Sequence, residues 1–136
     1  MWTCEQVIGA SLDVAEAAAL YRASTLAERR PVEDTGRFTS MLAGANLVVT
    51  ARDGEGRLIG IARSLTDGVY STYLGDLAVD VAWQGKGVGR DLIRATREAA
   101  PQAKVILLSA PAAVDYYPHI GFERHDSAWT MTATAG

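Results

Sequence analysis

Three glycines within five residues form the part of the sequence best suited to bind an anion. Gly85, Gly87 and Gly89 lie between an apolar segment and a segment with helical spacing, so they join a strand end to a helix start. Backbone N–H groups in such a loop are not covered by side chains, and the dipole of the following helix attracts negative charge. The loop therefore predicts a phosphate-binding site at the N-terminus of a helix.

The residues around these glycines exclude two common nucleotide-binding loops. A Walker loop needs Ser or Thr directly after its lysine, whereas Lys86 is followed by Gly87. The dinucleotide fingerprint would need glycine at the position of Arg90. The pattern that remains is Q-x-x-G-x-G, formed by Gln84, Gly87 and Gly89.

This pattern resembles the pyrophosphate loop of the GNAT superfamily of N-acetyltransferases, and a second motif supports the resemblance. Segment 117–122, Y-P-H-I-G-F, is similar to the family's Y-x-x-x-G-F element, and segment 75–79 is similar to its central strand. The motifs occur in the family's order, with room between them for one helix and one strand. The resemblance implies a mixed α/β fold, with a mainly antiparallel central sheet, helices on both faces and a V-shaped notch.

The resemblance also implies that the chain binds acetyl-CoA. Leu77, Ala78 and Val79 are expected to offer backbone groups to the pantetheine arm, where the central strand parts from its neighbour. The residues expected around the pyrophosphate are Gln84, Gly85, Lys86, Gly87, Val88, Gly89 and Arg90. No metal is expected, because the two histidines and one cysteine lie far apart in the sequence.

Two residues are candidates for the chemistry. Tyr117 matches the tyrosine with which many family members protonate the departing thiolate, and its neighbour Tyr116 is expected in the core. The family often places a glutamate base on the central strand, but Tyr73 and Gly75 occupy the expected positions. Asp76 is acidic, yet strand alternation turns it to the opposite face unless a β-bulge re-aims it. A water chain to bulk solvent is an alternative base.

Less specific interpretations stay open at this point. The glycines could form only a tight turn, Tyr117 could be a packing residue, and Asp76 could hold a loop or a helix end. Ala110 occupies the place of an asparagine that the family uses near its last helix. These departures motivate an alternative function, an acyl-CoA-binding regulatory module with the same fold and little or no turnover.

Hydrophobic periodicity predicts the elements that position these residues. Helices are expected over 13–21, 38–44, 88–100 and 112–117, and strands over 47–51, 58–62, 70–81, 105–108 and 129–132. Asp13 and Glu16 have the spacing of a capping box at the start of the first helix. The strand–helix–strand unit over 70–108 requires a right-handed parallel crossover. The first and last few residues are expected to be loose.

Composition limits the classes of protein to which the chain can belong. Its 136 residues fit one domain, 1–136, and its single cysteine cannot form an internal disulfide, which favours the cytoplasm. No apolar run approaches the roughly 20 residues of a membrane span. A net charge of −3 without a basic stripe argues against nucleic-acid binding. We expect an acetyltransferase for a primary amine on a small molecule or peptide, and, by analogy with the family, a homodimer.

Overall fold

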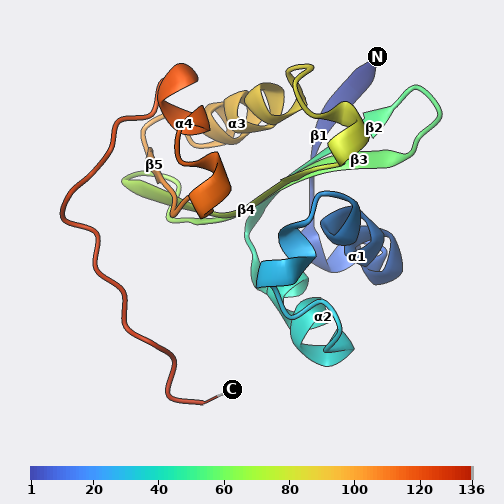
Figure 1. The fold of residues 1–136 in the computed structure, drawn as a ribbon, viewed down its shortest axis with the longest axis horizontal. Helices are drawn as coiled ribbons and strands as arrows, with labels where there is room; N and C mark the ends of the chain where they lie inside the picture. Colours follow the sequence, from blue (N-terminus) through green and yellow to red (C-terminus); the bar gives the residue numbers. More distant parts are fainter. Residues whose placement is uncertain (136) are drawn as a thin grey trace.

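The computed structural model of the chain describes residues 1–135 and is built around one twisted sheet. Its strands are β1 (Trp2–Val7), β2 (Leu47–Asp53), β3 (Leu58–Thr66), β4 (Ser71–Val79) and β5 (Lys104–Ile106). They lie in chain order across the sheet (Figure 1). The pairs from β1 to β4 are antiparallel, and β5 is parallel to β4. The mainly antiparallel mixed sheet predicted from the sequence is confirmed.

Helices cover both faces of this sheet, as predicted (Figure 1). They are α1 (Val14–Ala23), α2 (Thr35–Gly44), α3 (Val88–Ala99) and α4 (Tyr116–His119). Short 3-10 helices lie at Gly9–Ser11, Leu26–Arg29, Val81–Trp83 and Pro111–Ala113. The helices α1 and α2 pack on one face, and α3 and α4 lie on the other. None of the helices within residues 1–135 is long and apolar enough to cross a membrane.

Strand alternation gives each face of the sheet its own apolar core. The first core lies under α1 and α2, where Tyr21 meets Phe38 edge to face at 4.9 Å and Ile61 of β3 is fully buried. The second core lies under α3, where Leu92 packs against Val49 of β2 and its neighbours. Because both faces are covered there, β2 and β3 begin with nearly continuous apolar segments, over 47–51 and 58–62.

The helix N-termini differ in how their free N–H groups are satisfied. Asp13 caps α1 by accepting a hydrogen bond from the backbone N–H of Glu16 at 3.1 Å, as the capping box predicts. Asp34 caps α2 in the same way, through the N–H of Arg37 at 3.1 Å. The helix α3 begins after Gly87 without a side-chain cap. Its first N–H groups therefore stay available to another acceptor.

The N-terminus is not loose, contrary to the expectation from the sequence. Residues 2–7 form β1, which pairs with β2 along its whole length. Trp2 and Cys4 alternate toward the second core and pack against it. The local sequence concealed this strand because its apolar residues are few, and its stability comes from distant partners.

The C-terminal prediction is wrong in a different way. No strand forms over 129–132 in the described residues, and the chain runs clear of the sheet after α4 (Figure 1). Trp129 and Met131 are almost fully exposed. A strand needs backbone partners, and this segment has none within residues 1–135. The helix predicted over 112–117 is instead divided between Pro111–Ala113 and α4.

Candidate functional site

The central strand parts from its neighbour halfway along its length. The strands β4 and β5 pair only from Ser71 with Lys104 to Tyr73 with Ile106. Beyond that point, the described part of β4 pairs with β3 alone. This separation matches the notch that the family resemblance implies, and it leaves one edge of β4 without a partner strand in the described residues.

Backbone groups of alternate residues point from β4 into this notch. The N–H of Asp80 donates to the carbonyl of Ile59 in β3 at 2.9 Å, which sets the phase of the ladder. Because hydrogen bonding alternates along an antiparallel pair, Ala78 also faces β3, whereas Leu77 and Val79 face the notch. The side chain of Ala78 lies in the first core. Of the three residues predicted to contact a ligand here, the geometry therefore supports Leu77 and Val79 and not Ala78.

The glycine loop leads from the end of β4 to α3. Gln84 donates from Nε2 to the carbonyl of Val79 at 2.9 Å and ties the loop back to the strand. Gly85 and Gly87 have φ values of 77° and 103°, a left-handed conformation that other residues adopt only with strain. These glycines are therefore required by the path of the backbone itself.

The loop ends in a row of free hydrogen-bond donors. The first helical bond of α3 runs from the N–H of Asp91 to the carbonyl of Gly87 at 3.1 Å. The N–H groups of Val88, Gly89 and Arg90 have no acceptor within residues 1–135. Three such groups at the positive end of a helix dipole suit a phosphate or pyrophosphate.

The side chains next to these N–H groups differ in whether they can contact a bound anion. Lys86 and Arg90 are exposed beside the free N–H groups, so their cationic side chains can reach the same anion. Val88 is buried in the second core and can take part only through its backbone.

An aromatic pair that sequence reasoning missed borders the loop. A methyl group placed on Gly87 would lie 3.8 Å from the ring of Trp2, so that ring borders the loop. Trp2 meets Trp83 edge to face at 6.2 Å and donates from Nε1 to Asp91 at 2.9 Å. The only available clue was an aromatic residue near the chain start, whose position against the loop depends on the pairing of β1 with β2.

Two tyrosines of α4 lie on the same face of the sheet as the loop. Tyr117 packs edge to face between Tyr116, at 5.3 Å, and Phe122, at 5.4 Å, against the second core. Burial raises the pKa of Tyr117, so its hydroxyl remains protonated at neutral pH. Tyr116 is exposed rather than in the core, and its hydroxyl would lie 3.0 Å from a methyl group on Gly89. The prediction that Tyr116 lies in the core is therefore wrong.

Asp76 lies at a β-bulge in the central strand. Opposite β3, Asp76 pairs with Arg63 and Leu74 pairs with Ser64, so Gly75 is an extra residue on β4. The bulge changes the face on which the following side chains lie. It turns Asp76 away from the α3 side of the sheet and toward α1, where the carboxylate is 1% exposed.

The Asp76 carboxylate is held by three donors. It accepts hydrogen bonds from the Tyr21 hydroxyl at 2.7 Å, from Nε of Arg63 at 2.6 Å and from Nε of Arg30. Burial alone would raise the pKa of Asp76, but Arg63, Tyr21 and Arg30 outweigh it and hold the pKa below its ordinary value. Arg30 also donates to the carbonyl of Gly75 at 2.9 Å. A fully partnered, ionised carboxylate is a poor proton acceptor, so the geometry argues against Asp76 as a general base.

The predicted site residues therefore divide between the two faces. The glycine loop, Leu77 and Val79 converge at the end of the notch, on the side where α4 also lies. On the opposite face of the sheet, the cluster around Asp76 binds the segment between α1 and α2 to the bulge. Within residues 1–135, no group of three or more His, Cys, Asp or Glu side chains is arranged to hold a metal ion.

Comparison with known protein families shows which family has such a loop. The sequence profile of the acetyltransferase (GNAT) domain matches residues 24–131, which is most of the chain. The chain belongs to the GNAT acetyltransferase family. The resemblance inferred from the two motifs is thereby confirmed.

Known GNAT proteins resemble this chain over different lengths. The probable acetyltransferase TAP2 of Glycine max is 28% identical over 134 residues, covering 89% of this chain and 53% of that protein. The chloroplastic GCN5-related N-acetyltransferase 2 of Arabidopsis thaliana is 33% identical over 72 residues, covering 51% of this chain and 28% of that protein. This GNAT chain thus spans about half or less of the length of these relatives.

A solved structure shares the fold over nearly the whole chain. It is a probable acetyltransferase of unknown function from meticillin-resistant Staphylococcus aureus, with a TM-score of 0.76 and 21% identity. The match covers 99% of this chain and 100% of that one. A match over 99% of the chain includes β1 and α1, which precede the residues that the family profile matches.

Proposed function

We propose that this chain transfers the acetyl group of acetyl-CoA to a primary amine on a small molecule or peptide. The observation that carries the proposal is the joint presence of an uncapped helix N-terminus and an unpaired strand edge. The first offers free N–H groups at α3, and the second offers the backbone of Leu77 and Val79. Membership of the GNAT acetyltransferase family supports acetyl transfer as the reaction.

The residues at the notch fit the two polar parts of acetyl-CoA. The N–H groups of Val88, Gly89 and Arg90, with Lys86 beside them, suit its pyrophosphate. The N–H groups of Leu77 and Val79 and the C=O group of Leu77, at the β4 edge, suit the amides of its pantetheine arm, as an added strand would. When bound, acetyl-CoA supplies an acyl group activated as a thioester.

The chain's own groups would then polarise the acyl carbonyl and supply the proton that the leaving sulfur takes up. The amine nitrogen forms the new C–N bond while the C–S bond breaks, in a ternary complex without a covalent enzyme intermediate. A backbone N–H at the β4 edge polarises the acyl carbonyl. Tyr117, kept protonated by its raised pKa, donates its proton to the leaving sulfur. The amine's proton leaves through water, because Asp76 is engaged by its arginines.

The first experiment is thermal unfolding of the purified chain with acetyl-CoA, CoA, ATP or NAD. A ligand at about 100 times its dissociation constant stabilises a protein by roughly 2.7 kcal/mol. In a domain of this size we expect Tm to rise by several degrees with acetyl-CoA and CoA, less with ATP and not with NAD. No rise at saturating acetyl-CoA would contradict the proposal.

The second experiment measures CoA release with a panel of amines, including polyamines, aminoglycosides and lysine-containing peptides. Release that depends on one class of amine supports acetyl transfer and identifies the acceptor. Stabilisation by acetyl-CoA without release for any amine would favour the alternative, an acyl-CoA-binding regulatory module.

A further inference from the structure

An apolar patch lies open across the strands β3, β4 and β5. Leu65 of β3 pairs with Tyr73 of β4, and Tyr73 pairs with Ile106 of β5, so these three side chains lie side by side on one face. It is the face on which Arg63, two residues before Leu65, binds Asp76. The three side chains are between 40% and 45% exposed, so α1 and α2, which pack on this face, leave the patch uncovered.

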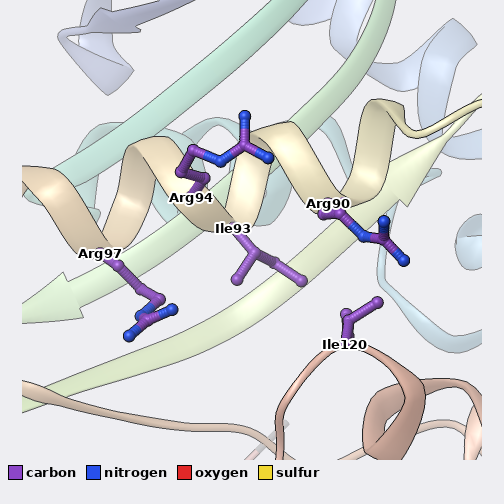
Figure 2. Close-up of a pocket in the computed structure, with 5 residues that line it drawn as sticks. All are labelled: Arg90, Ile93, Arg94, Arg97 and Ile120. Atoms are coloured by element: carbon purple, nitrogen blue, oxygen red, sulfur yellow. The ribbon is translucent and has the colours of Figure 1, made fainter.

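The outer edge of β5 is open beside this patch. Within the described residues, β5 is the last strand of the sheet and pairs with β4 alone. The opposite face is already covered here, since Val105 and the nearby Leu107 pack against the second core. Figure 2 shows α3 on that covered face, where Ile93 and Ile120 line one pocket. A strand added to the edge of β5 therefore needs its apolar side chains on the side of the patch.

The C-terminal segment has the pattern of such a strand. In residues 128–132, Trp129 and Met131 alternate with Thr130 and Thr132, which gives an extended chain one apolar and one polar face. Both apolar side chains are more than nine-tenths exposed, and the segment runs clear of its own sheet (Figure 1). Large apolar groups that are exposed together mark a surface that another molecule covers. Within residues 1–135, this segment has no partner strand and the patch has no cover.

We infer that segment 128–132 of one copy pairs with the outer edge of β5 in a second copy, and that the exchange is reciprocal. Trp129 and Met131 of the partner subunit then cover the apolar patch. A twofold pair of copies satisfies both open features at once, because each chain provides one segment and one edge. The nine residues from His119, at the end of α4, to Ala128 span at most about 30 Å when extended, which lets the segment cross to the second copy.

The other edge of the sheet is less suited to this segment. The exposed side chains of β1 are Thr3, Glu5 and Gln6. They are polar and offer Trp129 no apolar surface, whereas the patch beside β5 is apolar throughout. The exposed side chains therefore select β5 over β1 as the edge to which the segment is added.

The exchanged strand also lies next to the notch. Tyr73 and Ile106 form the last pair before β4 and β5 part, so the partner's segment extends the wall that β5 contributes there. The pairing itself does not depend on acetyl transfer, so it can be tested without an amine or acetyl-CoA.

Light scattering coupled to size-exclusion chromatography tests the pairing from both of its sides. The unmodified chain is expected at twice the 14.5 kDa of one copy. Ile106→Lys places a charge in the patch, and Trp129→Glu with Met131→Glu places charges on the segment. Because burial of an unpaired charge is costly, each variant is expected to weaken the dimer by about 30-fold or more, as the loss of an interface hot spot does.

A mixture of the two variants is the decisive measurement. The unchanged segment of the first variant meets the unchanged patch of the second, and in the other pairing the new lysine faces the new glutamates. The mixture is therefore expected to form a 1:1 dimer at concentrations where each variant alone is a monomer. Pairing of a segment with β5 of its own chain cannot give this result.

Ile8→Lys is the matched control for Ile106→Lys. Ile8 is an exposed apolar residue directly after β1, at the opposite edge of the sheet, so its replacement is expected to leave the dimer intact. Circular dichroism of each variant verifies the fold before the masses are compared.

Three results would overturn the inference. They are a single-chain mass for the unmodified chain at high concentration, a dimer that persists in both variants, and a mixture that stays monomeric. None of these results bears on stabilisation by acetyl-CoA, which tests the proposed function separately.

Discussion

Replacing Asp76 by asparagine removes the negative charge that lies between Arg30 and Arg63. The side chains of these arginines are only 24% and 12% exposed, so water compensates little for the lost partner. Breaking a buried ion pair from one side costs about 3–5 kcal/mol. Because both arginines keep some contact with solvent, we expect a loss near the lower end, about 3 kcal/mol. For a chain of this size, that corresponds to a fall in Tm of about 10 °C.

Thermal unfolding followed by circular dichroism at pH 7 measures this loss. Glu33→Gln is the matched control, because it also replaces a carboxylate by an amide within an ion pair. Its partner is Arg22, and the two side chains are 85% and 52% exposed. An exposed pair contributes at most about 1 kcal/mol, so the control is expected to shift Tm by no more than about 3 °C.

The difference between the unmodified chain and Asp76→Asn should also depend on pH. In the folded chain, burial raises the pKa of Asp76, but Arg63, Tyr21 and Arg30 lower it further, and the net direction is downward. The stabilisation is therefore fully present above the unfolded-state pKa of about 3.9. It is lost as the pH falls through the lower folded-state pKa, so the two Tm values should converge in acid.

One result would refute this interpretation of Asp76. If Asp76→Asn unfolds within about 2 °C of the unmodified chain yet loses acetyl transfer, the carboxylate is not a structural anchor. It would then have to act on the substrate, as the sequence first suggested.

Further predictions concern turnover, the loop and assembly. Tyr117→Phe is expected to lower kcat by about 100-fold or more with little change in acetyl-CoA affinity. The matched Tyr116→Phe is expected to keep kcat, and the reverse pattern in a CoA-release assay would reassign the acid. Gly87→Ala forces a side chain into the left-handed region, at about 1–2 kcal/mol, and should weaken acetyl-CoA binding in calorimetry. Gly54→Ala, in open space without positive φ, is its control, and unchanged affinity in Gly87→Ala would contradict the loop's role. The exposed apolar residues at 129–131 and the open edge of β5 favour a homodimer. Light scattering that gives the single-chain mass at high concentration would contradict this.

Local patterns predicted the part of the chain that binds the ligand. The glycine loop and α3 are specified by neighbouring residues, because Gly85 and Gly87 supply the backbone conformation and the next residues have helical spacing. The cap of α1 by Asp13 is equally local. Such features depend on residues within a few positions of one another, which a sequence displays directly.

The environment of Asp76 could not be predicted in this way. Its three partners, Tyr21, Arg30 and Arg63, are 55, 46 and 13 residues away in the sequence. Each is an ordinary surface or core residue in its own segment. Only the bulge at Gly75, together with the packing of α1 on the sheet, brings them to one carboxylate.

By itself, the sequence determined the glycine loop, the amphipathic helix after it and the alternating strands, because backbone preference and hydrophobic spacing are properties of neighbouring residues. The tertiary structure decided which of the two tyrosines is buried, where Trp2 lies and whether Asp76 is a base or an anchor. These outcomes depend on long-range pairing and burial, whose energies arise only when distant segments meet.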